Sequence, residues 1–144
     1  MGLRVLLVLG VLAVALVAGL LWRSRNGRFV AAPAGPRAVD RLTAADLGAP
    51  LGAGATFLQL SSAACAPCRS TAAVLTALAG ERPGVAHVEV PAEDRLDLVR
   101  RFAVLRTPTV LVLDGTGAVR GRLSGATTRQ QALDALDRCP ATAA

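Results

Sequence analysis

The chain has 144 residues and a mass of 14.7 kDa, which allows one folded domain with an appendage and excludes a multidomain enzyme. Hydrophobic residues make up 53% and charged residues 18%, which excludes an intrinsically disordered chain. The net charge of +6 lies mostly in residues 1–45, and with one Trp and three Phe as the only aromatic residues the chain lacks the basic, aromatic face that nucleic-acid binding requires.

The first predicted element is a membrane-spanning helix. Residues 5–22 form an uninterrupted apolar stretch, close in length to the roughly 20 residues that a helix needs to cross the hydrocarbon core. A cleaved signal peptide is the alternative, with residues 13–15 as its small-residue site, but cleavage there would leave residues 16–22 exposed on the product. We therefore predict an uncleaved anchor over residues 1–22, in contact with the lipid bilayer through residues 5–22.

The anchor is followed by a predicted tether and one folded domain. Residues 23–45 contain two glycines and two prolines among small and basic residues, a composition typical of a flexible tether. Their arginines outnumber Arg4, the single one before the apolar stretch, so the positive-inside rule places the C-terminal domain in the cytoplasm. Residues 46–144 are sufficient for one small α/β core.

The folded part is predicted to have the order β-α-β-α-β-β-α. Its strands are short apolar or alternating runs bounded by turn residues, and its helices carry apolar residues at helical spacing. The expected elements are a strand at 56–60, a helix from 65 to about 80, a strand at 85–90, a helix from about 93, a hairpin of strands 109–113 and 118–123, and a helix from 128. A capping box at Thr43–Asp46 predicts one further helical turn before them.

Cys65 and Cys68 are the candidate catalytic residues, because they lie where a predicted strand gives way to a helix. Free backbone N–H groups and the positive end of the helix stabilise a thiolate at Cys65, and Arg69 adds a nearby positive charge. Cys65 is therefore expected to attack a substrate disulfide, and Cys68 to resolve the mixed disulfide. Pro67 stiffens the turn at a position where its missing N–H costs little.

A lone CxxC pair also allows other interpretations. A zinc site needs four ligands, and the chain adds only Cys139 and His87, which are distant in sequence, so no metal site is predicted. A structural disulfide across so short a loop would stabilise the fold little. His87, two residues before Glu89 on one strand face, is interpreted as structural. Cys139 is interpreted as an incidental free cysteine near a mobile C-terminus, with capture of a partner or redox sensing as the alternatives.

From about Thr56 to Leu136 the chain resembles the thioredoxin family. Three features carry the resemblance: the Cys65-Ala-Pro-Cys68 sequence after a buried strand, Thr107-Pro108-Thr109 at the start of a sheet strand, and Gly125 before the last helix. The resemblance implies a thioredoxin-like fold, which is an α/β fold with a central mixed sheet flanked by helices. Here one N-terminal transmembrane helix would precede it.

The resemblance also implies the roles of further residues. A cis peptide bond is expected before Pro108, which would shape a substrate groove, and backbone groups of Thr107 would pair with the client chain. The buried aspartate that assists the second cysteine in thioredoxins aligns with Gln59, which hydrogen-bonds but takes up no proton. Ala64 stands where thioredoxins usually have tryptophan, so substrate contacts should differ.

The sequence thus predicts a membrane-anchored thiol-disulfide oxidoreductase, a membrane-tethered and TlpA-like member of the wider family. It would act on protein disulfides or dithiols, need no bound cofactor and depend on an unidentified electron donor. Disulfide reduction is the expected direction, and oxidation stays open. The alternatives are a tethered binding module that captures clients beside Pro108 without turnover, and a thiol protein that handles copper or zinc. The resemblance also allows an extracytoplasmic domain, against the arginine count.

Overall fold

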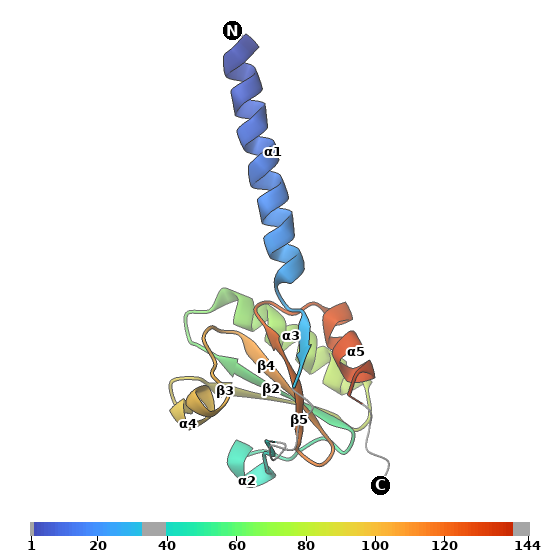
Figure 1. Cartoon of the computed structure of the whole chain (residues 1–144). Coiled ribbons are helices and arrows are strands. Elements are labelled where there is room, and N and C mark those ends of the chain that lie inside the picture. Colours follow the sequence, from blue (N-terminus) through green and yellow to red (C-terminus); the bar gives the residue numbers. More distant parts are fainter. Residues whose placement is uncertain (1, 33–39, 140–144) are drawn as a thin grey trace.

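A five-stranded mixed sheet is the centre of the structure, a computed structural model that describes residues 2–32 and 40–139 (Figure 1). The strands are β1 (Phe29–Ala31), β2 (Ala55–Ser61), β3 (Val85–Pro91), β4 (Thr109–Asp114) and β5 (Val119–Ser124), in the sheet order β1-β5-β4-β2-β3. β2 and β3 run parallel, and every other neighbouring pair is antiparallel. The four strands expected from the sequence are confirmed.

Helices cover both faces of the sheet (Figure 1). They are α3 (Ala66–Glu81) and α5 (Arg129–Asp137) on one face, and α2 (Ala44–Leu47) and α4 (Leu96–Arg101) on the other. The N-terminal helix, α1 (Gly2–Arg25), covers neither face. From β2 onward the order is the predicted β-α-β-α-β-β-α. The predicted capping box before the first of the short helices is also present, since Thr43 and Asp46 exchange hydrogen bonds at the start of α2.

Alternating side chains of the strands divide the core into two layers. In β2, Phe57 points to the face covered by α3 and α5, whereas Leu58 points to the face covered by α2 and α4. Both side chains are fully buried, and burial of each contributes roughly 1.5–3 kcal/mol. Because every residue of β2 is buried, this strand is the rigid element from which the following turn and α3 extend.

α1 projects away from the sheet (Figure 1). Its residues Gly2–Leu21 have a mean hydropathy of 2.7, and none of this segment is buried. Its leucine and valine side chains are between 54% and 73% exposed. The helix is therefore long and apolar enough to cross a membrane, as the sequence predicted.

The flexible tether predicted for residues 23–45 requires correction in its described parts. α1 continues to Arg25, and residues 29–31 form the edge strand β1 against β5. The ring of Phe29 lies where a side chain on Gly121 of β5 would stand, so this glycine makes room for the strand. Leu42 is fully buried in the core. The folded domain thus begins before residue 46, and the rest of the predicted tether, residues 33–39, lies outside the described residues.

Candidate functional site

Cys65 and Cys68 lie at the beginning of α3, where the sequence placed them. Cys65 is the N-cap residue, Cys68 lies in the first turn, and the two form a disulfide with Cα atoms 5.2 Å apart. Cys68 is only 2% exposed, whereas Cys65 is partly exposed. Cys65 is therefore the sulfur that a second molecule can reach.

The turn between β2 and α3 holds Cys65 in the position of a helix cap. The N–H of Cys65 donates to the carbonyl oxygen of Ser62 at 3.1 Å, and the N–H of Cys68 lies 3.1 Å from Cys65 Sγ. Pro67, exposed, occupies the first turn of the helix, where a missing N–H leaves no hydrogen bond unmade. A thiolate at Cys65 would thus accept a hydrogen bond from the helix N-terminus.

Thr107 and Pro108 lie beside this turn. The peptide bond between them is cis, as the resemblance implied. The hydroxyl oxygens of Thr107 and Ser62 are 3.1 Å apart, and the carbonyl oxygen of Pro108 accepts a hydrogen bond from Gly125 at 2.8 Å. Within the described part of the chain, the backbone N–H and C=O of Thr107 have no hydrogen-bond partner. These groups are available to an extended client chain, which is the role expected for Thr107.

Gln59 is fully buried beneath the second cysteine. Its Nε2 lies 3.0 Å from the carbonyl oxygen of Cys68 and 2.8 Å from Ser61 Oγ. Its Oε1 is buried without a hydrogen-bond partner among the described residues. Gln59 therefore holds the backbone of Cys68 in place, but an amide in this position moves no proton.

Glu89 is the residue of this site that the sequence analysis missed. It lies opposite Gln59 in the parallel register of β2 and β3, its Oε1 is 3.1 Å from Gln59 Nε2, and it accepts a hydrogen bond from Ser61. The sequence analysis considered Glu89 only as a neighbour of His87. The signal that would have revealed it is strand register, which relates residues thirty positions apart.

Glu89 and both cysteines border one cavity of about 430 Å³. Arg69 and Glu93 also line it, so the cavity has charged groups of both signs around the disulfide. A carboxylate of a side chain exposed to solvent thus shares a cavity with the buried sulfur of the second cysteine. This arrangement makes Glu89 a candidate acceptor for the proton of Cys68.

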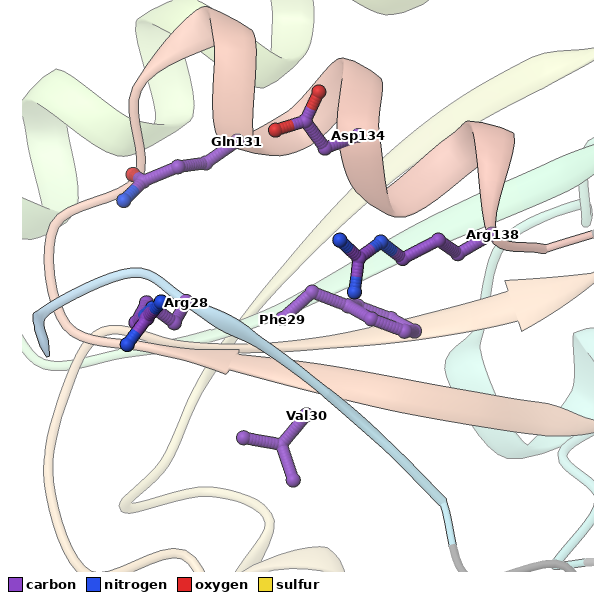
Figure 2. Close-up of a pocket in the computed structure, with 6 residues that line it drawn as sticks. All are labelled: Arg28, Phe29, Val30, Gln131, Asp134 and Arg138. Atoms are coloured by element: carbon purple, nitrogen blue, oxygen red, sulfur yellow. The ribbon is translucent and has the colours of Figure 1, made fainter.

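A larger cavity, of about 530 Å³, lies between β1 and α5 (Figure 2). Its lining residues are Arg28, Phe29, Val30, Gln131, Asp134 and Arg138. Figure 2 shows the ring of Phe29 on the side of α5 and the side chain of Val30 pointing the other way. The cavity contains neither cysteine, so its size does not make it the candidate redox site.

His87 and Cys139 lie apart from the cysteine pair's cavity. His87 Nδ1 is 3.0 Å from Thr76 Oγ1, and burial lowers the pKa of His87 while the charge of Glu89 opposes that shift. The placement of Cys139 near a mobile terminus is corrected: it is 6% exposed, packs in the core, and burial raises its pKa to about 11. Among the described residues no three His, Cys, Asp or Glu side chains are grouped to hold a metal ion.

Comparison with known proteins identifies the fold. No family model and no curated protein matches the chain. A thioredoxin from Nicotiana alata shares 20% identity, with 61% of this chain and 75% of that chain covered and a TM-score of 0.53. The thioredoxin of Fasciola hepatica shares 24%, covering 61% and 83%, with a TM-score of 0.53. Mitochondrial thioredoxin 3 from Saccharomyces cerevisiae, in its oxidised form, shares 20%, covering 58% and 77%, with a TM-score of 0.52. The chain has the thioredoxin fold.

Proposed function

We propose that this chain is a membrane-anchored thiol-disulfide oxidoreductase that exchanges disulfides with protein clients. The proposal rests on the Cys65–Cys68 disulfide at the start of α3, with one sulfur accessible and the other buried. Beside it lies the Thr107–Pro108 loop, where the backbone groups of Thr107 have no hydrogen-bond partner among residues 2–32 and 40–139.

Cys65 is the nucleophile in the reductive direction. Its thiolate attacks one sulfur of a client disulfide, so that a bond between Cys65 and the client forms while the client's own S–S bond breaks. The departing client sulfur takes up a proton. The hydrogen bond from the Cys68 N–H stabilises the Cys65 thiolate before it attacks the client disulfide.

Cys68 completes the reaction as the resolving thiol. It loses its proton and attacks Cys65 Sγ, the mixed disulfide breaks, and the second client sulfur leaves and is protonated. The client gains two electrons and two protons, and the protein is left with the Cys65–Cys68 disulfide seen in the structure. An electron donor must then reduce this disulfide, and the same steps in reverse would oxidise a client.

Glu89 is the proposed acceptor for the proton of Cys68. Gln59 stands below Cys68 but takes up no proton, and Cys68 is too buried to exchange readily with bulk water. Glu89 lines the same cavity, is held by Ser61 and Gln59, and is exposed enough to pass a proton on to solvent. Glu89 on β3 would therefore take the role of the buried aspartate that thioredoxins have at the position of Gln59 on β2.

The anchor is proposed to be residues 5–22 of α1, spanning the bilayer once. Their length and hydropathy support this, and the arginine asymmetry favours a domain that faces the cytoplasm. Labelling of Cys65 and Cys68 in intact cells with a membrane-impermeant maleimide, after an impermeant reductant has opened any accessible disulfide, tests the side. Labelling only after lysis is expected, and labelling of intact cells would place the domain outside the cytoplasm.

Trapping of mixed disulfides tests the redox function. Cys68→Ser should accumulate covalent complexes with client proteins, released by a reductant, because the second step is blocked while the first is intact. Cys65→Ser should form none, and Cys139→Ser should behave as the wild type because that thiol is buried. A binding module without turnover would give no covalent complex with any variant, which would refute the proposal.

A further inference from the structure

The anchor joins the sheet at the same edge as the redox pair. Only residues 26–28 separate the end of α1 from β1, and β1 runs antiparallel to β5, with Phe29 opposite Leu123. Thr109 is paired with Ser124 on one side and with Leu60 on the other. The beginning of β1, the beginning of β4 and the end of β2 therefore lie together. We call this the redox edge, and the opposite edge, with the β4–β5 turn at residues 115–118, the turn edge.

Direct contacts connect the end of α1 to the substrate loop. The side-chain oxygen of Asn26 lies 3.4 Å from Nη1 of Arg106, the residue before Thr107, and the Asn26 carbonyl accepts from Gln131 Nε2 at 2.9 Å. A side chain on Gly125 would lie 3.5 Å from Asn26, and the Gly125 N–H donates to Pro108. A single residue, Asn26, thus connects the end of the anchor to the loop that lies beside the disulfide.

The junction between the anchor and the domain is short and closely packed. Gly27 has a φ of +71°, and its N–H donates to the Ser124 carbonyl at 2.9 Å. A Cβ on Gly27 would lie 2.5 Å from the carbonyl oxygen of Ala126, so the backbone is closely packed there. From Leu21 to Arg25 the helix rises only about 6 Å, roughly the depth of the headgroup layer. The redox edge would therefore lie against the lipid headgroups.

The exposed side chains beside the anchor and the redox cavity suit such a position. Leu105 is 93% exposed directly before Arg106, and Arg28 and Arg69 are exposed as well. Apolar and arginine side chains together favour an anionic membrane surface. The acidic residues that line the redox cavity, Glu89 and Glu93, lie on β3 and just after it, and β3 is the strand farthest from β1 in the sheet.

We propose that the redox edge faces the bilayer at the level of the headgroups, and that the clients are membrane proteins whose cysteines lie at the membrane surface. The proposal rests on the redox function and on the membrane anchor proposed above. It goes further because it predicts that clients are selected by the distance of their disulfides from the bilayer surface. The redox edge would lie at that surface, whereas the turn edge would lie one strand length, about 20 Å, farther from it. A disulfide far above the membrane would be out of reach of Cys65.

A pair of labelled alanines tests the orientation without any redox chemistry. Ala63 and Ala53 are both exposed and flank the two ends of β2. Each is changed to cysteine in a full-length Cys65→Ser, Cys68→Ser background, labelled with a fluorophore, and placed in vesicles with quencher-labelled headgroups. Several-fold stronger quenching at Ala63→Cys is expected. Equal quenching at the two sites, stronger quenching at Ala53→Cys, or failure of the chain to remain with the vesicles would overturn the proposal.

Two synthetic transmembrane peptides test the choice of client. One carries a disulfide loop at the headgroup boundary, and the other carries the same loop on a rigid spacer about 30 Å above it, which exceeds one strand length. The full chain should reduce the first at least about tenfold faster, since the anchor raises the effective concentration only near the surface. A flexible 20-residue insertion between Arg25 and Asn26, with a reach of about 25 Å, should abolish that preference. Equal rates of the wild-type chain on the two anchored peptides would overturn the selection of clients by their distance from the membrane.

A soluble disulfide peptide separates the two levels of inference. Wild-type and insertion forms should reduce it at equal rates, because it needs no membrane contact. Failure of both forms to reduce it would overturn the redox function, and with it the assignment of clients, while the labelled alanines would still decide the orientation. Reduction of the soluble peptide together with equal rates on the two anchored peptides would overturn only the selection of clients by their distance from the membrane.

Discussion

The two edges of the sheet each bury a polar side chain, and they satisfy it differently. At the turn edge, Asp114 Oδ1 accepts from the N–H of Thr116 at 2.8 Å and of Ala118 at 3.1 Å, and Oδ2 accepts from Arg120 at 2.7 Å. At the redox edge, Gln59 Oε1 is buried without a partner in the described part of the chain. An unmet buried hydrogen bond costs stability. The turn edge is therefore built for stability, whereas the redox edge gives up stability beside the reactive sulfurs.

The largest effect on stability is expected at the turn edge. Asp114→Ala leaves the N–H groups of Thr116 and Ala118 without their acceptor and removes the partner of Arg120, so the free energy of unfolding should fall by about 3 kcal/mol. For a domain of this size that corresponds to a loss of about 15 °C in Tm. Thermal unfolding of the full chain in detergent measures it. Asp137→Ala, at an exposed position, is the control and should change stability by less than about 0.5 kcal/mol.

Disulfide exchange should not follow that loss. Below its Tm, Asp114→Ala should reduce a soluble disulfide peptide at the wild-type rate, because the turn edge lies at the far end of β4 from Thr109 and the redox cavity. If Asp114→Ala lowered the rate of disulfide exchange together with the stability, the two edges would not have separate roles. A loss of less than about 1 kcal/mol would also contradict that separation, since it would show that Asp114 is not the stabilising centre of the turn.

Gly27 at the redox edge is expected to give the next largest effect. Gly27→Ala forces a left-handed backbone on alanine and brings its Cβ to 2.5 Å from Ala126 O. Gly48→Ala is a matched control, with a φ of +65° and no atom within 4 Å of the added Cβ. Both carry the backbone strain of about 1 kcal/mol, and Gly27→Ala should cost about 1–2 kcal/mol more through the close contact.

Hydrogen exchange shows where that energy is lost. In Gly27→Ala the amides of β1 should exchange faster, because the strand is released from β5, while the amides of β2 should keep their protection. Equal exchange in the two glycine variants would mean that the junction between anchor and domain is not held at Gly27. That result would weaken the fixed orientation of the redox edge.

Local pattern accounts for most of the fold. β2 and α3 were predictable because an apolar run and helical spacing each specify an element without reference to the rest of the chain. β1 was not, since its three residues carry no periodicity and are held by pairing with β5 and by the space that Gly121 leaves for Phe29. The composition of residues 23–45 predicted a flexible tether, but residues 29–31 form a strand because they pair with β5.

The site divides in the same way. Cys65, Cys68 and the Thr107–Pro108 dipeptide were found because each is a short motif with a fixed relation to a strand or helix. Glu89 was missed because its relation to the site comes from the register of β2 against β3. Cys139 was misplaced because helical packing after α5, rather than distance from the chain end, decides its burial.

Removal of the Glu89 charge tests whether the redox edge contributes to the rate of disulfide exchange. Glu89→Gln keeps the shape of the side chain but removes the proton acceptor, so release of the mixed disulfide should slow by about tenfold, equivalent to about 1.4 kcal/mol. Single-turnover kinetics separates the two steps, and attack by Cys65 should keep its rate. Glu93→Gln, which removes the same charge from the same cavity, is the control and should leave both steps unchanged. Equal slowing by both variants would indicate a general electrostatic effect.

His87, on β3 between the two edges, should give the smallest effect, visible as a dependence of stability on pH. Burial lowers its pKa in the folded state below the usual 6.5, and the charge of Glu89 only partly opposes this. The unfolded chain therefore binds the proton more readily, so stability should fall as pH drops below about 7 through 6.5, and level off below the folded pKa. His87→Gln removes the titrating group and should flatten the unfolding curve in that window. An unchanged slope would assign the pH dependence to groups other than His87.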